Sequence, residues 1–105
     1  MTDALVVLVT APTAEQAAEL ARALVDERLA ACGNVLAGVR SVYRWEGSVH
    51  EDAEALLVLK TTRARFEALR ERVIALHPYQ VPEVLALPVE AGSADYLAWI
   101  AAETG

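Results

Sequence analysis

Apolar residues recur along this chain with two different periods, and the change of period divides it into strands and helices. Residues 4–10 form a continuous aliphatic run, Ala-Leu-Val-Val-Leu-Val-Thr, which is typical of a strand buried on both faces. The apolar positions that follow have the spacing of a helix with one wet side. Residues 13–16 (Thr-Ala-Glu-Gln) predict a capping box, in which the Thr13 hydroxyl accepts a backbone N–H and Gln16 reaches back. We expect this helix to end near Leu29.

The period changes to two at Val35, which predicts a long β-hairpin. Odd-numbered residues from Val35 to Trp45 are assigned to one face of its first strand, and even-numbered residues to the other. This strand spans roughly 36 Å, whereas a domain of this length has a radius of gyration of only about 13 Å. The hairpin therefore reaches across the domain, and we expect its tip, with Tyr43 and Trp45, to be covered by a second subunit.

The turn of this hairpin is predicted at Gly47, which supplies a positive φ, with Ser48 as the second turn residue. The return strand runs over residues 50–61, beginning acidic and ending aliphatic. In this register Arg44 faces Glu51, and such a pair of opposite charges favours the pairing.

Two further helices and one strand complete the pattern. A helical repeat begins at a threonine cap, Thr61 or Thr62, and ends at His77; a strand over residues 83–89 and a short helix follow. The order is therefore β-α-β-β-α-β with an added C-terminal helix. It predicts an α+β fold of the ferredoxin-like type, an antiparallel four-stranded sheet with both helices on one face, in a single domain over residues 1–105.

The composition disfavours several classes of function. The net charge is −6, the pI is about 4.8 and no run of lysine or arginine occurs, so neither nucleic acids nor anionic membrane surfaces are expected partners. Hydrophobic residues make up 55% of the chain, which suits a buried subunit surface. The single cysteine, Cys32, excludes an internal disulfide. The first apolar run is too short to span a membrane and lacks the charged start of a signal peptide, so we expect a cytoplasmic protein.

A stiff connection, residues 77–83 (His-Pro-Tyr-Gln-Val-Pro-Glu), joins the second helix to the last strand. Its two prolines restrict φ, and each pushes the residue before it out of the helical region. The connection also carries an imidazole, a phenol and a carboxylate. His77 can therefore serve as a helix C-terminal residue that interacts with the last carbonyls, or as a ligand for a bound group.

Several motifs spread along the chain resemble those of one protein family. They are Thr-Ala-Pro at 10–12, Ala-Ala-Cys at 30–32 with Asn34, Tyr-Arg-Trp-Glu-Gly at 43–47, Leu-Lys-Thr-Thr at 59–62, the connection at 77–83 and Tyr-Leu-Ala-Trp at 96–99. Together they resemble the CutA family, the divalent-cation tolerance proteins. The resemblance implies a ferredoxin-like subunit, a homotrimer related in architecture to the PII signalling proteins, and a link to copper and other heavy metals. Our first hypothesis is therefore a non-enzymatic, metal-responsive trimer, and we expect no organic cofactor.

The resemblance also implies where copper would bind. His77 matches a histidine ligand of the family, whereas Leu76 and Val9 stand where some members have a second histidine and a cysteine. Soft ligands are thus scarce, and Glu83 is a second ligand if the connection folds back. We therefore expect copper or another divalent cation to bind weakly at His77 and Glu83, with water or another subunit completing the site.

A second hypothesis is a small-molecule sensor of the PII type, with an anionic ligand in clefts between subunits. Lys60 and Arg44 would meet the anion. Tyr43 and Trp45 would form apolar walls, and Cys32 completes this ligand cleft. The tight hairpin turn argues against the hypothesis, because it leaves no large loop of the sort PII proteins use for nucleotides and partners. Lys60 can also be read as a solvated charge at a strand end, and Cys32 as a small buried apolar residue.

An enzyme is the third hypothesis. Cys32, His77 and Asn34 have the residue types of a thiol dyad with an orienting amide, but residue types alone support that arrangement. Acylphosphatases share this fold class and need a phosphate cradle after the first strand. Residues 10–13 contain neither glycine nor arginine, so that cradle is missing here. We therefore expect no catalysis.

Overall fold

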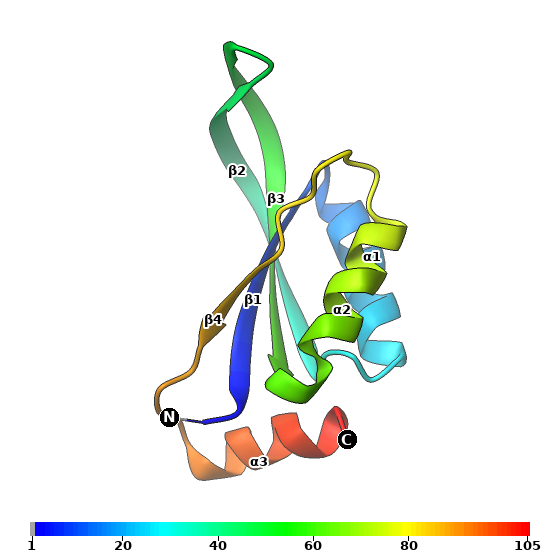
Figure 1. Cartoon of the computed structure of the whole chain (residues 1–105), viewed down its shortest axis with the longest axis vertical. Helices are drawn as coiled ribbons and strands as arrows, with labels where there is room; N and C mark the ends of the chain where they lie inside the picture. Colours follow the sequence, from blue (N-terminus) through cyan, green and yellow to red (C-terminus); the bar gives the residue numbers. More distant parts are fainter. Residues whose placement is uncertain (1) are drawn as a thin grey trace.

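The computed structural model describes residues 2–105, and within this range the chain forms one antiparallel sheet with helices against it (Figure 1). The strand order is β2-β3-β1-β4. This arrangement confirms the α+β, ferredoxin-like fold with an added C-terminal helix. The elements are β1 (Ala4–Ala11), α1 (Ala14–Asp26), β2 (Cys32–Trp45), β3 (Ser48–Thr62), α2 (Arg63–Leu76), β4 (Leu85–Pro88) and α3 (Ala94–Glu103).

Strand β1 lies between β3 and β4 and has two unlike faces. Val7 and Val9 are fully buried in the core beneath α1 and α2. Val6 and Leu8 point to the other side and are partly exposed. The expectation of a strand buried on both faces is therefore wrong for the single chain, because these two helices cover one face only. We call the uncovered side the open face; on three adjacent strands it comprises Val6, Leu8, Thr10, Leu56, Val58, Lys60, Leu85 and Leu87.

Helix α1 begins where the sequence predicts and ends earlier. The Gln16 N–H donates to the Thr13 hydroxyl oxygen at 3.1 Å, whereas the Gln16 side chain meets the Thr13 hydroxyl rather than its backbone. The helix ends at Asp26 and not near Leu29, because Arg28 adopts the left-handed conformation with φ of 60°. The next N–H groups bond back to carbonyls of the last turn in a Schellman arrangement. Glycine usually occupies this position, so the arginine conceals the helix end in the sequence.

Strand β2 contains a bulge that reverses its alternation. Leu36 pairs with Leu56 and Val39 pairs with Glu54, so two residues of β2 stand opposite one of β3. Gly38, at the bulge, has φ of +78°. The single face assigned to odd-numbered residues from 35 to 45 is therefore wrong. Leu36 lies on the open face, and beyond the bulge the odd-numbered residues take over that face.

The hairpin turn lies one residue earlier than expected. Glu46 and Gly47 have positive φ values of 49° and 82°, as in a two-residue turn whose twist matches the strands. Arg44 consequently pairs with Val49 and not with Glu51. The shift in pairing is two residues, so the faces of the two strands are unchanged.

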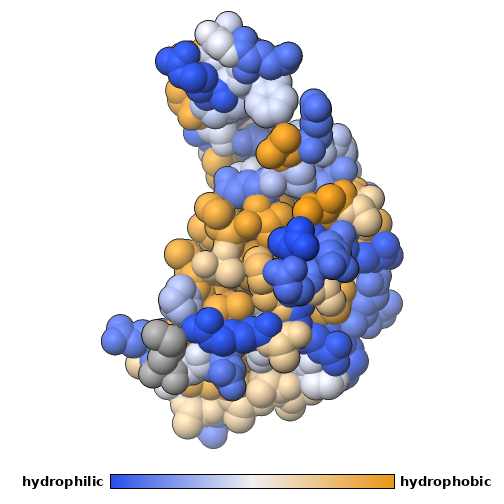
Figure 2. Space-filling view, viewed as in Figure 1, coloured by the Kyte–Doolittle hydropathy of each residue, from blue (hydrophilic) through white to orange (hydrophobic). Residues whose placement is uncertain are grey.

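The hairpin beyond the bulge, residues 39–54, projects from the rest of the molecule, and we call it the arm (Figure 1). The chain measures 44 × 25 × 23 Å along its principal axes. Hydrophobic side chains gather over the strands in the middle of the molecule, whereas the arm's tip is mainly hydrophilic (Figure 2). None of the helices within residues 2–105 is long and apolar enough to cross a membrane.

Candidate functional site

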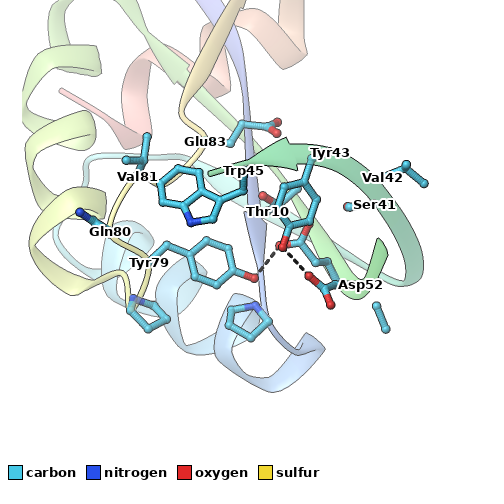
Figure 3. Close-up of a pocket in the computed structure, with 14 residues that line it drawn as sticks. Thr10, Ser41, Val42, Tyr43, Trp45, Asp52, Tyr79, Gln80, Val81 and Glu83 are labelled. Carbon is cyan, nitrogen blue, oxygen red and sulfur yellow. Dashed lines mark hydrogen bonds between the residues drawn. The ribbon is translucent and has the colours of Figure 1, made fainter. Parts of the chain in front are cut away.

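A groove of about 910 Å³ lies where the arm meets the connection at 77–83 (Figure 3). It draws residues from the end of β1, both strands of the arm and the connection. We call it the acidic groove. Its lining residues are Thr10, Pro12, Ser41, Val42, Tyr43, Trp45, Asp52, Ala53, Glu54, Pro78, Tyr79, Gln80, Val81 and Glu83.

The fold brings these side chains together from both sides of the groove. The bulge sets the alternation of the arm so that Tyr43 and Trp45 share the open face with Glu54. From the other side, α2 ends at Leu76 because His77, before a proline, has the extended ψ of 139°. The chain then turns toward the arm and places Tyr79 in the groove (Figure 3).

Two phenols bind two carboxylates in the groove. The Tyr79 hydroxyl donates to Glu54 at 2.5 Å, and the Tyr43 hydroxyl donates to Asp52 (Figure 3). Desolvation, followed by the hydrogen bond to Glu54, raises the pKa of Tyr79. The hydrogen bond to Asp52 is the main cause of the raised pKa of Tyr43. Both phenols therefore act as proton donors that hold a carboxylate, and neither is poised as a base.

The third carboxylate, Glu83, has no hydrogen-bond or ion-pair partner within residues 2–105. Its side chain is partly buried, and desolvation, followed by repulsion from Glu54, raises the pKa of the Glu83 carboxyl. No lysine, arginine or histidine occurs among the described residues that line the groove. The groove therefore concentrates negative charge that the single chain does not neutralise.

His77 follows the last residue of α2, does not line the groove and is 8% exposed. Its Nε2 is 2.7 Å from the Thr10 carbonyl oxygen, and its Nδ1 accepts the Tyr79 N–H at 3.1 Å. Because a carbonyl only accepts, these contacts require the tautomer with its proton on Nε2. His77 thus ties the start of the connection to the end of β1.

The predicted metal ligands, His77 and Glu83, do not form a ready ligand set in the single chain. Both ring nitrogens of His77 are engaged, and His77 lines a separate small cavity while Glu83 lines the acidic groove. The described part of the chain holds no group of three histidine, cysteine, aspartate or glutamate side chains suited to a metal ion. The metal assignment to these two residues stays a prediction.

The predicted anion cleft is divided between distant parts of the single chain. Tyr43 and Trp45 line the acidic groove, but Arg44, the residue between them, lies on the opposite face of the arm. Lys60 and Cys32 pair with each other at the other end of the sheet. The structure therefore gathers the two apolar walls without either predicted cation.

The end of the sheet that holds Cys32 and Lys60 is organised by contacts of its own. The Lys60 ammonium donates to the Asn34 side-chain oxygen. The Cys32 sulfur lies 3.6 Å from the Tyr96 hydroxyl of α3, and this hydrogen bond is the main cause of the raised pKa of Tyr96. Cys32 is only partly buried. The chain therefore does not bring the Cys32 thiol to His77, which lies against the far end of β1.

Sequence reasoning gave no site role to Asp52 or Glu54, which supply the carboxylates of the two phenol–carboxylate pairs. Their side of β3 is visible only once the pairing with β1 is known, since Leu56 opposite Thr10 defines the open face. The sequence did indicate Tyr79 as a candidate, because a phenol on a proline-flanked connection is held in place at little entropic cost.

Comparison with known proteins covers almost the whole chain. The sequence profile of the CutA1 divalent ion tolerance protein family matches residues 5–103. The divalent-cation tolerance protein CutA of Thermus thermophilus is 55% identical over 100 residues, which are 95% of this chain and 97% of that protein. The chloroplastic protein CutA of Arabidopsis thaliana is 50% identical over 91% of this chain, which spans only 53% of the plant protein.

A solved structure shows the same fold. The crystal structure of CutA from Xylella fastidiosa superposes with a TM-score of 0.96 at 39% sequence identity, covering 99% of this chain and 100% of the other. Profile, sequence identity and fold thus agree over nearly the full length. The chain belongs to the CutA1 divalent ion tolerance family.

Proposed function

We propose that this protein is a cytoplasmic, non-enzymatic homotrimer that contributes to tolerance of divalent heavy-metal cations, copper among them. The observation that carries the proposal is the 55% identity to a protein named for divalent-cation tolerance, an identity that extends over 97% of that protein. The name describes that relative, and its transfer to this chain is our inference.

The surface of the single chain supports an assembly of several copies. On the open face, Leu36, Leu85 and Leu87 are 46%, 56% and 50% exposed. Apolar side chains gathered on one sheet face mark an interaction surface. The arm, which has no core of its own, extends beside it. A second and third copy of the chain would cover both.

Sedimentation equilibrium tests the assembly directly. A homotrimer of an 11.3 kDa chain has a mass of about 34 kDa, and we expect this value at micromolar concentration. A monomer under the same conditions would contradict the proposal.

The metal site of the proposal is weak and open. Neutral imidazole is a good ligand for Cu²⁺, but His77 has to give up its contact with Thr10 or with Tyr79 to coordinate it. Glu83 has free oxygens, and water or a second subunit would supply the remaining ligands. We therefore expect micromolar affinity at best, decreasing at low pH because protons compete for the imidazole.

Copper titration of matched variants locates the site. We expect His77→Ala and Glu83→Gln to weaken copper binding and His50→Ala to leave it unchanged. His50 is a suitable control because it lies on the exposed arm, stacked on Tyr43 at 5.5 Å. Circular dichroism of His77→Ala is needed because the variant also loses two internal hydrogen bonds. Copper binding that survives the loss of His77 but not of His50 would place the site on the arm.

A sensor of anions, as in PII proteins, has less support from the geometry. The groove beside Tyr43 and Trp45 is lined by carboxylates, which repel an anion. Lys60 and Arg44 would have to be supplied by other subunits. Calorimetry with a nucleotide tests this alternative, and the proposal above predicts no binding.

A further inference from the structure

Helix α3 lies across the end of the sheet that is opposite the arm (Figure 1). Ala4 of β1 is on the same face as Val6 but is only 5% exposed, because it packs in a small apolar cluster with Ile100 of α3. Ala31, directly before β2, is buried in the same cluster. Val6, the next residue of that face, is partly exposed. Helix α3 therefore closes over one end of the open face, on the side of the sheet opposite α1 and α2.

The apolar contacts of α3 are few. Ile100 is the only buried residue of the helix, Leu97 beside it is partly buried, and their cluster is separate from the main core. Ser93, at the start of the helix, makes no side-chain capping hydrogen bond. A ten-residue helix is only marginally stable by itself, and elements with little buried apolar surface open more readily than the core. Further contacts are thus required to hold α3 against the sheet.

Two arginines supply such contacts at the end of α3. The Arg28 guanidinium donates to the Ala102 carbonyl oxygen at 2.7 Å and to the Gly105 carbonyl oxygen at 3.3 Å. Arg65 Nε donates to the Thr104 carbonyl oxygen at 2.6 Å. The last carbonyls of a helix have no partner within it and attract positive charge. Arg28 follows α1 and Arg65 belongs to α2, so both helices of the core hold the end of α3.

Arg28 makes these contacts from a strained backbone. Its φ of 60° lies in the left-handed region, where a residue with a Cβ is disfavoured and glycine is not. Strain of this kind persists where the surrounding structure enforces it, and it often marks a residue with a further role. A glycine at position 28 would relieve the strain and lose the guanidinium. One substitution therefore separates the ending of α1 from the holding of α3.

We propose that α3 is a strap that closes one end of the open face and opens as a unit, with Arg28 and Arg65 as its latch. Opening exposes Ala4 and separates the Tyr96 hydroxyl from the Cys32 sulfur, which lies 3.6 Å away in the closed strap. The closed strap therefore sets where the open face ends. Every contact of the strap and latch lies within one chain, so the proposal requires neither a metal ion nor a given number of copies.

Amide hydrogen exchange, resolved residue by residue on the protein as purified, tests the strap. In the parent we expect the bonded amides of α3, from Leu97 onward, to share one opening equilibrium and to exchange faster than those of β1. Arg28→Gly should speed exchange about tenfold across α3, because two charge-assisted hydrogen bonds are lost, and leave β1 unchanged. Acceleration confined to the last turn would mean fraying and overturn the proposal. So would α3 amides that exchange only when the whole protein unfolds.

Two further variants test the latch. Arg65→Ala should also speed exchange of every bonded α3 amide, because the contact to Thr104 is lost. Arg22→Ala removes the same charge from an exposed position on α1 and should leave α3 unchanged. An equal acceleration by Arg22→Ala and Arg28→Gly would mean an effect of net charge alone, and the latch would be wrong. Sedimentation of the parent decides the assembly separately, so failure of the strap leaves the proposed trimer standing.

Discussion

The two halves of strand β3 have the same backbone and very different surroundings. Residues 48–53, in the arm, are all exposed, whereas from Ala55 to Thr61 every second residue is buried. The strand pairs continuously with β2 on one side, apart from the bulge, but with β1 only from Ala55 onward. Helices α1 and α2 cover that second half alone. Backbone hydrogen bonds to β2 are therefore sufficient to form the strand. Burial of its side chains depends on whether β1 and the helices lie beside it.

The arm is held by contacts that are individually weak. Arg40 and Glu51 form an ion pair at 3.2 Å, but their side chains are 77% and 54% exposed, and such pairs contribute about 0–1 kcal/mol. Tyr43 stacks on His50 with ring centroids 5.5 Å apart. The base of the sheet instead has a packed aliphatic core. A projecting arm of this kind is expected to depend on a partner surface for its stability.

The largest expected effect tests that dependence at the tip. Trp45→Ala should cost roughly 3–5 kcal/mol and lower the mass below that of the trimer, because the proposed assembly buries the indole. In the single chain Trp45 is 39% exposed, so without a partner the cost would be much smaller. Thermal unfolding together with sedimentation measures both quantities. An unchanged melting curve and mass would show that the arm is free.

A pair of truncations in β3 compares the two halves directly. Leu59→Ala should cost about 2–5 kcal/mol, because Leu59 is fully buried under the helices and leaves a cavity. Val49→Ala should change stability by no more than about 0.5 kcal/mol, since Val49 is 64% exposed in the arm. Denaturant unfolding of both variants gives the difference. Comparable losses would mean that the arm is as tightly packed as the base.

The bulge between the two halves is the third test. Gly38→Ala should cost about 1–2 kcal/mol, because φ of +78° is unfavourable for a residue with a Cβ. A Cβ there would meet no atom within 4 Å, so crowding does not contribute. Gly92→Ala, where a Cβ makes ordinary contacts with Leu97, is the control and should be nearly neutral. A Gly38→Ala variant as stable as the parent would show that the bulge relaxes.

The smallest expected effect concerns Glu83, where the base meets the arm. Its pKa in the folded protein is raised above the ordinary value of 4.5, so near and above pH 4.5 the native state holds more protons than the unfolded state. Stability from this group therefore falls as pH rises through that window. Glu83→Gln should raise the melting temperature at pH 7 and have little effect near pH 4. A lower melting temperature at pH 7 would contradict the inferred repulsion with Glu54.

Local signals in the sequence were sufficient for the elements and their order. Thr13 begins α1 through a hydrogen bond within four residues of itself, and His77 ends α2 because the proline after it excludes the helical conformation. Periods of 3.6 and 2 distinguish helices from strands over short stretches, and the ferredoxin-like arrangement follows from their order. The family motifs identified the family, because they are spread across nearly the whole chain.

Tertiary structure alone decided the faces and the groove. Gly38 is a local sign of a bulge, but only the pairing with β3 shows that the register slips there and puts Tyr43 and Trp45 on the same face as Glu54. Arg28 likewise takes a conformation that the sequence would assign to glycine. Pairing register and side-chain proximity depend on residues far apart in the chain, as in the hydrogen bond from Tyr79 to Glu54, which are 25 positions apart. The sequence by itself therefore determined which segments form strands and helices, while the contacts between them determined where charge and aromatic rings collect.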